Sequence, residues 1–383
     1  MVFLQLGAGS MTLSISSAFD SGNIIVNSLE SASDIRLAIR LDKDSEFYQW
    51  FHFRLSGAKG QACQMRIENA GSSAYPQGWP NYKACASYDR ETWFRVPTNY
   101  EDGVLTISHT PAQDAVYYAY FAPYSMERHG DLIAEAAIVE DVSLVELGQT
   151  LDGRAIDCLQ VGEGPKTVWV IARQHPGETM AEWWMEGFIA RLLNEADPVA
   201  RKLRTLATFH IVPNMNPDGS FRGHLRTNAA GINLNREWAA PSLEKSPEVF
   251  HVLEAMRASG ADLFLDVHGD EALPYNFIAG SEGAPGFNEA DDARLIAYKQ
   301  ALVDASPDFQ TQYGYPRNAP GKANMSIAGN AIFGYFGCLA MTLEMPFKDN
   351  ADLPDEMFGW SLERCRCLGA ANLDAMLADL TGV

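Results

Sequence analysis

The first third of the chain has the short, alternating pattern of β-strands. Residues 35–41 alternate apolar and polar side chains, and residues 48–55 are rich in aromatic side chains. A period of two is typical of strands that bury one face. Turn-forming residues separate further strand-like runs at 64–67, 93–96, 104–109 and 115–122. This spacing predicts an N-terminal antiparallel β-sandwich domain over residues 1–125.

From residue 126 onward, apolar strand-like runs alternate with helical segments. Strands are predicted at 155–161, 167–173, 207–213, 262–267 and 338–345. Helices are predicted at 177–194, 247–258, 289–304 and 356–380. This alternation is typical of an α/β sheet that helices cover on both faces. We therefore predict a second domain, of α/β/α architecture, over residues 126–383.

Composition and charge narrow the classes of function. The 383 residues include 29 Lys and Arg against 49 Asp and Glu, which gives a formal net charge of −20. A chain this acidic is not expected to bind nucleic acid or an anionic membrane surface. The six cysteines form no CxxC pair, which favours reduced thiols and a cytoplasmic location. The N-terminus lacks the pattern of a signal peptide, and Met11 is a candidate start that would make residues 1–10 an extension.

The sharpest local motif follows a strand of the buried type. His175 and Glu178 lie three residues apart in the segment RQHPGE at 173–178. His268 ends another apolar strand, and open α/β sheets place their sites at the carboxyl ends of strands. Two histidines and a glutamate form the ligand set of many catalytic zinc sites. The alternatives are that Glu178 only caps a helix and that His268 is a hydrogen-bonded core histidine.

Further candidates lie in the long segment 212–238 and near the end of the chain. The segment contains NPDG at 216–219 and arginines at 222, 226 and 236. Long loops in compact domains are usually functional, and arginine suits binding of a carboxylate or an oxyanion. Glu344 lies on a late apolar strand, where a carboxylate can serve as a general base.

Taken in order, these motifs resemble those of the M14 zinc metallocarboxypeptidases. The segments 172–178, 216–226 and 233–238 are similar to the signatures of the cytosolic carboxypeptidase, or Nna1-like, branch. That branch carries a β-sandwich before its catalytic domain, and the segments 51–55, 67–69, 87–96 and 117–124 resemble it. The resemblance begins near residue 15. It implies a catalytic domain with a mixed, mostly parallel sheet of about eight strands between helices.

The resemblance also implies a role for each site residue. One zinc ion would be held by His175, Glu178 and His268. Glu344 would take a proton from zinc-bound water and pass it to the leaving amine, and Arg226 would stabilise the oxyanion. The residues expected to bind substrate are Asn235 and Arg236, which would clamp its terminal carboxylate, and Arg173. The implied reaction is hydrolysis of the C-terminal peptide bond of peptides or protein tails.

Two positions depart from the family pattern. Asn233 stands where the family usually has an aspartate that orients a zinc histidine, and the loss of such a partner commonly costs 10–100-fold in metal affinity or activity. Asn324 stands where glutamate-trimming members have an arginine, so Lys322 and Arg317 are the candidate cations for an acidic C-terminal residue. Tyr313 and Tyr315 are candidates for the tyrosine that closes over the substrate.

Two other functions stay open at this point. A zinc amidohydrolase of the aspartoacylase or succinylglutamate-desuccinylase type shares HxxE and the late histidine, and hydrolysis of N-acyl amino acids would distinguish it. A non-catalytic peptide-binding module would retain the pocket without turnover, which Asn233 allows and Glu344 argues against. We also expect the sandwich to pack on the catalytic domain and to narrow access to its cleft.

Overall fold

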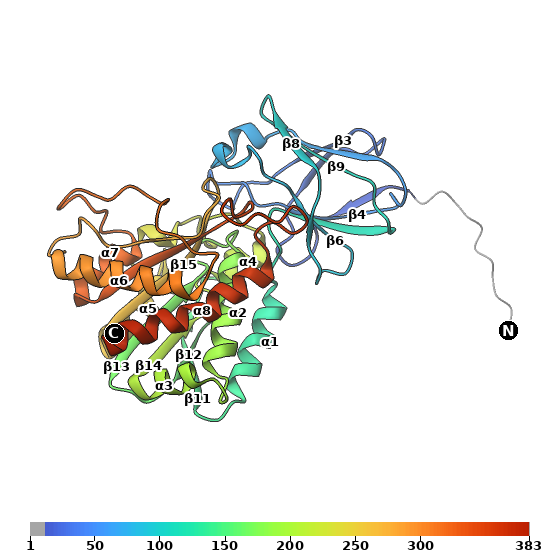
Figure 1. Cartoon of the computed structure of the whole chain (residues 1–383). Helices are drawn as coiled ribbons and strands as arrows, with labels where there is room; N and C mark the ends of the chain where they lie inside the picture. The colour runs from blue at the N-terminus through green and yellow to red at the C-terminus, as the bar shows by residue number, and fades with distance from the viewer. Residues whose placement is uncertain (1–11, 383) are drawn as a thin grey trace, which may run out of the picture.

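The computed structural model describes residues 12–382, so the expectation about residues 1–10 lies outside it. Two five-stranded sheets precede residue 120 (Figure 1). The first has the order β1 (Ser14–Ser16), β4 (His52–Ser56), β10 (Ala115–Ala119), β6 (Cys85–Ser87) and β7 (Phe94–Arg95). The second has the order β2 (Ile25–Ser28), β3 (Ile35–Ala38), β5 (Cys63–Ile67), β9 (Val104–His109) and β8 (Thr98–Glu101). We call these two sheets the N-terminal sandwich.

The two sheets of the sandwich share one apolar core. Leu37, Met65 and Ile107 from the second sheet and Phe53 and Val116 from the first are fully or almost fully buried in the same cluster. The alternation seen in the sequence places these side chains on the inner faces. The strands pair antiparallel with one exception, because β3 runs parallel to β5. The prediction of an antiparallel sandwich is confirmed, and β3–β5 is the one parallel pair among the described strands of these two sheets.

A seven-stranded mixed sheet follows in the order β11, β12, β14, β13, β15, β17 and β16. Its strands are β11 (Val142–Gln149), β12 (Ala155–Val161), β13 (Lys166–Ala172), β14 (Ala207–Val212), β15 (Leu263–Asp270), β16 (Phe277–Ala279) and β17 (Leu339–Pro346). The four strands β14, β13, β15 and β17 are parallel, and the outer pairings are antiparallel. The α/β prediction is confirmed, although the described residues contain seven strands in this sheet instead of eight.

Helices cover both faces of this sheet. They are α1 (Met126–Ala137), α2 (Met180–Leu192), α3 (Pro198–Leu206), α4 (Pro217–Arg222), α5 (Pro247–Ser259), α6 (Glu289–Ala305), α7 (Ala328–Phe336) and α8 (Leu362–Thr381). Val168 and Val170 of β13 pack in one apolar cluster with α2, α6 and α8, whereas Trp169 and Ile171 pack in another with α5 and α7. The alternating strand therefore separates two helical layers. In the part of the chain that is described, none of the helices combines the length and apolar character that crossing a membrane requires.

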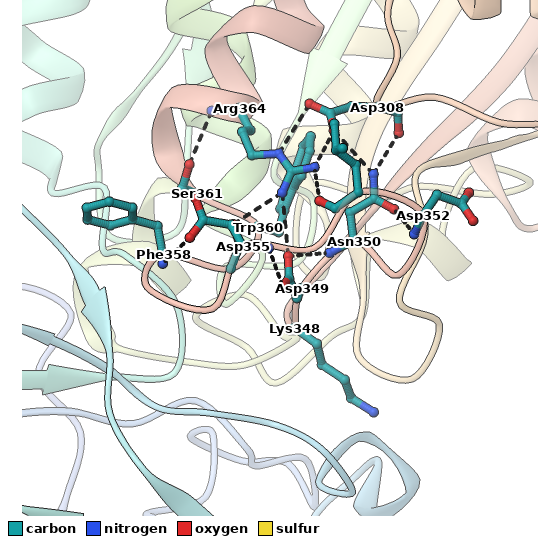
Figure 2. A network of polar contacts seen from close by, with 12 residues as sticks. Asp308, Lys348, Asp349, Asn350, Asp352, Asp355, Phe358, Trp360, Ser361 and Arg364 are labelled. Atoms are coloured by element: carbon teal, nitrogen blue, oxygen red, sulfur yellow. Dashed lines mark hydrogen bonds and ion pairs between the residues drawn. The ribbon is translucent and has the colours of Figure 1, made fainter.

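Polar contacts secure the chain where it leaves β17. Figure 2 shows the Arg364 guanidinium between the carboxylates of Asp308 and Asp349, with Lys348 pointing away from the network. From the sandwich, Arg95 donates hydrogen bonds to the backbone carbonyls of Phe347 and Trp360, at 2.9 and 3.1 Å. Both sets of contacts hold the segment that begins three residues after Glu344.

A buried ionic cluster links α1 to α2 and gives the first prediction. His129 of α1 lies 2.6 Å from Glu182 and 3.5 Å from Asp157. Burial lowers the pKa of His129, but these carboxylates outweigh it and raise the pKa from 6.5 to about 9. Charging of His129 therefore stabilises the fold below pH 6.5, and this contribution is lost as the pH rises through about 9.

We expect the stability difference between wild type and His129→Gln to shrink with rising pH. The shrinkage between about pH 6 and pH 10 should approach 3 kcal/mol, since one pKa unit corresponds to about 1.4 kcal/mol. Urea unfolding of both proteins at a series of pH values measures it. A difference that stays constant over this range would show that His129 is not charged in the folded protein.

Candidate zinc centre and active-site cleft

The site forms at the carboxyl ends of three neighbouring parallel strands. Ala172 of β13 pairs with Val267 of β15, and His268 of β15 pairs with Glu344 of β17. The chain leaving β13 turns through His175 and Glu178 before α2 begins at Met180. Glu178 thus precedes the helix instead of lying in its first turn, which corrects the predicted start at residue 177. The backbone N–H of Glu178 donates to the His175 carbonyl at 3.1 Å.

His175, Glu178 and His268 converge in the way a metal site requires. All three are buried, and one ligand atom from each lies within 4.8 Å of the other two. The Nδ1 atoms of the two histidines are 3.2 Å apart. Each Nδ1 atom also lies 2.7 Å from one oxygen of Glu178. The structure therefore brings together the three predicted ligands.

The hydrogen-bond partners of the two Nε2 atoms show why a cation fits between the two Nδ1 atoms. His175 Nε2 is 3.1 Å from Asn233 Oδ1, and His268 Nε2 is 2.8 Å from Asp266 Oδ2. These acceptors favour protons on both Nε2 atoms, which leaves lone pairs on both Nδ1 atoms. Two nitrogen lone pairs and a carboxylate then face one another in a buried space. Such a donor set repels itself unless a cation lies between its members, and it suits zinc.

A relay of side chains orients His268. Asp266 accepts a hydrogen bond from the Gln174 amide at 2.6 Å, and Gln174 in turn accepts one from the Trp238 indole at 2.8 Å. Asn233 also accepts the backbone N–H of Asn235 at 3.1 Å. One histidine is therefore backed by a carboxylate and the other by a neutral amide.

Glu344 lies beside the three ligands and is buried, with 8% of its surface exposed. The Tyr315 hydroxyl donates to Asp270 at 2.6 Å and lies 3.3 Å from Glu344 Oε1. Burial raises the pKa of Glu344 well above its ordinary value, His268 opposes this, and the carboxylates of Glu178 and Asp270 add to it. The raised pKa means that this carboxyl group holds a proton more readily than an exposed glutamate does, which suits a group that accepts and then donates a proton.

A cavity of about 640 Å³ opens over the site. The predicted residues that line it are His175, Glu178, Arg226, Asn235, Arg236, Arg317 and Glu344. Asn235 accepts the Ala328 backbone N–H at 2.8 Å, which fixes its side chain. Tyr313 and Tyr315 also line the cavity, and of these two Tyr315 is the one bonded to Asp270.

Two predicted substrate-binding residues lie elsewhere. Arg173 is 1% exposed, and its guanidinium donates to Glu182 at 2.5 Å and to the backbone carbonyls of Tyr124 and Pro176. Arg173 has a left-handed backbone, with φ of 58°, where the chain enters the loop of the metal ligands. Its hydrogen bond to the Pro176 carbonyl supports that loop. Lys322 is exposed on a turn and is absent from the cavity wall. Both placements correct the predicted substrate contacts.

The NPDG motif supports the cleft without lining it. Asn216 accepts the Gly219 backbone N–H at 3.0 Å, and Asp218 accepts hydrogen bonds from Thr150 and Arg154, both at 2.8 Å. A Cβ atom on Gly219 would lie 2.4 Å from Pro176 of the metal-ligand loop. The motif therefore allows two loops to approach closely.

Several residues of the cavity wall are not among those predicted from the sequence. Tyr75 and Gln77 come from the N-terminal sandwich, about a hundred residues before the first metal ligand. Lys299 lies in the middle of α6, and Glu282 follows β16. None of these positions carries a local motif, so no signal in the sequence singles them out.

Comparison with known proteins identifies the family. The model of the zinc carboxypeptidases (M14) matches residues 134–359, and the model of the cytosolic carboxypeptidase N-terminal domain matches residues 15–121. The chain belongs to the M14 zinc carboxypeptidases. It is therefore a hydrolase that acts on peptides, and its family implies zinc. The predicted boundary at 125/126 falls between the two matches.

Relatives agree with this assignment. The metallo-carboxypeptidase from Burkholderia cenocepacia is 53% identical, covers 97% of this chain and all of its own, and superposes with a TM-score of 0.95. The metallo-carboxypeptidase from Pseudomonas aeruginosa, solved with (2-guanidinoethylmercapto)succinic acid, is 45% identical over 96% of this chain and 100% of its own, with a TM-score of 0.94. Cytosolic carboxypeptidase 6 of Caenorhabditis elegans is 26% identical over 88% of this chain and 80% of its own. The resemblance to the cytosolic branch is confirmed.

The second prediction rests on the different partners of the two histidine Nε2 atoms, a neutral amide for His175 and a carboxylate for His268. Asn233→Asp should raise zinc affinity about tenfold, because a carboxylate makes His175 a stronger ligand, whereas Asp266→Asn should lower it 10–100-fold. Competition with a chelator of known affinity measures both. If the two substitutions change zinc affinity in the same direction, the charge of these partners does not control the ligands.

Proposed function

We propose that this carboxypeptidase removes the C-terminal residue of peptides or protein tails by water attack that Glu344 assists. The observation that carries the proposal is that Glu344, Arg226, Asn235 and Arg236 line one cavity together with the metal ligands His175 and Glu178. A general base, an oxyanion donor and a carboxylate clamp are the groups that C-terminal hydrolysis requires.

Each site residue has a separate role in the proposed reaction. Zinc, when bound by His175, Glu178 and His268, supplies a Lewis acid that lowers the pKa of water and polarises the scissile carbonyl. Glu344 accepts a proton from the attacking water and later donates it to the leaving amine. Arg226 donates hydrogen bonds to the carbonyl oxygen as negative charge develops on it.

The carboxylate clamp explains why cleavage would be confined to the C-terminus. Asn235 and Arg236 line the cavity side by side, and the Arg236 guanidinium donates to the Asn235 carbonyl at 2.6 Å. An arginine with an adjacent amide binds a carboxylate in a fixed orientation. The Pseudomonas aeruginosa relative was solved in complex with a succinic acid derivative, a compound that bears carboxyl groups, which supports a carboxylate-binding function here.

We further propose acidic C-terminal residues, Glu or Asp, as preferred substrates. Phe277 pairs with Glu344 and Ala279 pairs with Thr342, so the cavity wall continues along β16 away from the base. Two cations, Lys299 and Arg317, line the cavity there with one anion, Glu282. Arg317 also pairs with Asp292 at 2.6 Å, which leaves Lys299 as the main candidate for the substrate carboxylate.

A panel of peptides that differ only in the last residue tests both proposals. Peptides ending in Glu, Asp, Lys, Arg, Phe or Ala, each with a free or amidated C-terminus, are followed by release of the terminal amino acid. We expect release from the free peptides only, and fastest for Glu or Asp. Cleavage of amidated peptides would contradict the clamp, and faster release of Lys or Arg would contradict the acidic preference. N-acyl amino acids serve as substrates for the amidohydrolase alternative, which the family match disfavours.

The location and the binding-module alternative complete the proposal. The curated relative is named a cytosolic carboxypeptidase, so we propose a cytoplasmic location for this chain as well. The binding-module alternative predicts zinc binding without release of any residue, and the same panel decides it.

A further inference from the structure

The loop that carries Arg226 is attached to the N-terminal sandwich by hydrogen bonds to its backbone carbonyls. We call residues 221–231 the arginine loop. The Ser21 backbone N–H donates to the Phe221 carbonyl at 3.0 Å, and the side-chain Nδ2 of Asn23 donates to the Gly223 carbonyl at 2.8 Å. A Cβ atom on Gly231, whose φ is 74°, would lie 2.3 Å from the Asp44 carbonyl oxygen. The loop is thus held at both of its ends.

Asp42 of the sandwich fixes the middle of the arginine loop. Its carboxylate accepts the backbone N–H groups of Leu225, Arg226 and Thr227 at 2.7, 2.8 and 3.0 Å. It also accepts the Thr227 hydroxyl at 3.0 Å. Asp42 is 2% exposed, so water does not replace these contacts. Hydrogen bonds to a buried carboxylate are among the stronger ones in proteins, and here they define the backbone of Arg226 from both sides.

Two aromatic rings of the sandwich hold the Arg226 side chain. The guanidinium carbon lies 5.2 Å from the centre of the Tyr75 ring and 5.6 Å from the centre of the Phe47 ring. Cation–π attraction at these distances restrains a guanidinium without using its N–H groups. Within residues 12–382 the Arg226 side chain makes no hydrogen bond, and its Nε is buried. Its donors are therefore left for a ligand in the cavity.

The same loop also contacts the metal-ligand loop. Gly177 N–H donates to the Leu225 carbonyl at 2.9 Å, next to the amide that Asp42 holds. A Cβ atom on Gly177 would lie 3.0 Å from that carbonyl oxygen. The position of Arg226 relative to the metal ligands is therefore set by a short path that begins at Asp42.

We propose that the N-terminal sandwich contributes to catalysis. Its residues Asp42, Phe47 and Tyr75 position Arg226 to stabilise the transition state. The inference rests on the proposed function, because it assumes that Arg226 stabilises the oxyanion. Asp42, which touches neither substrate nor metal in this account, is a positioning residue. Misplacing an oxyanion donor by about 1 Å costs on the order of 10²-fold in rate.

A double-mutant cycle of Asp42→Asn and Arg226→Ala tests the proposal in the full-length, zinc-loaded enzyme. Asparagine keeps the shape of Asp42 but turns an N–H group toward the loop amides. We expect Asp42→Asn to lower kcat about 10–100-fold with KM changed less than about threefold. In the Arg226→Ala background the same substitution should change kcat less than about threefold. An equal loss in both backgrounds would show that Asp42 is only structural and would overturn the inference.

Further variants keep the test decisive. Asp89 of the sandwich also accepts two loop N–H groups, those of Glu91 and Thr92, but does not line the cavity, so Asp89→Asn should leave kcat unchanged. If Asp42→Asn fails to fold, Phe47→Leu and Phe47→Tyr replace it. Loss of the ring should lower kcat several-fold and retention of the ring should not, and equal kcat values would overturn the proposal. A wild-type enzyme that releases no C-terminal residue would instead refute the proposed function.

Discussion

Glu344→Gln should lower kcat by about 10³-fold or more while zinc stays bound. The substitution keeps the size of a side chain that is 8% exposed and removes only its ability to carry a proton. General acid–base catalysis contributes roughly 10²–10⁴-fold, and in the proposed mechanism Glu344 serves in both directions. Its hydrogen-bond contact with Tyr315 survives in the amide. Steady-state kinetics with the preferred peptide, together with metal analysis, measure the effect.

A second buried glutamate provides the matched control. Glu248 is fully buried on α5, and burial raises its pKa to about 7, but it does not line the cavity. Glu248→Gln should therefore keep kcat within about twofold, since it touches none of the reacting groups and its amide oxygen still accepts the hydrogen bond from Asn228 of the arginine loop. If Glu344→Gln retains more than about a tenth of wild-type kcat, another group is the base. Asp270 and Glu271, which line the same cavity, would then be examined first.

Glu178→Gln should abolish stoichiometric zinc binding and, with it, peptide release. Glu178 is the one anion among the three predicted ligands, and its two oxygens each lie 2.7 Å from a histidine Nδ1 atom. One oxygen also accepts the Gly269 backbone N–H at 3.1 Å. A neutral amide leaves the metal with two imidazoles and no compensating charge, so we expect a loss of more than about 10³-fold in affinity. Metal analysis after dialysis and the peptide assay report both effects.

Glu186 on the following helix serves as the control for this change. It pairs with Arg128 and Arg366 at the surface of α2 and lies outside the cavity wall. Glu186→Gln should retain full zinc content and activity, because surface ion pairs contribute little to stability. Full zinc content in Glu178→Gln would mean that the cation is held elsewhere.

The three predicted metal ligands lie together in the structure because they lie at or just after the ends of neighbouring strands. His175 and Glu178 come after β13, His268 and Glu344 lie near the carboxyl ends of β15 and β17, and adjacent parallel strands bring these ends together. Spacing and position made them candidates, and the resemblance to the M14 carboxypeptidases selected them as ligands. The α/β alternation was equally clear, since the strand at 155–161 agrees with β12 residue for residue.

What could not be predicted depends on contacts between distant segments. Arg173 lies next to the metal-ligand loop in sequence, but its left-handed backbone turns the side chain toward Glu182 and away from the cleft. Asp42 and Tyr75 lie more than 150 residues before Arg226 and carry no motif. Their importance comes from how the sandwich packs on the arginine loop, and periodicity along the chain contains no information about that packing.

The most direct test of the proposed carboxypeptidase activity is to measure whether release of a C-terminal residue depends on zinc. Wild-type protein is freed of metal with a chelator, and zinc is then added back in measured amounts while release of the terminal residue is followed. We expect no release without metal and activity that rises in proportion to zinc until a single ion per chain is bound. Full activity in the chelated protein would contradict this expectation, as would binding of zinc without release from any peptide of the panel.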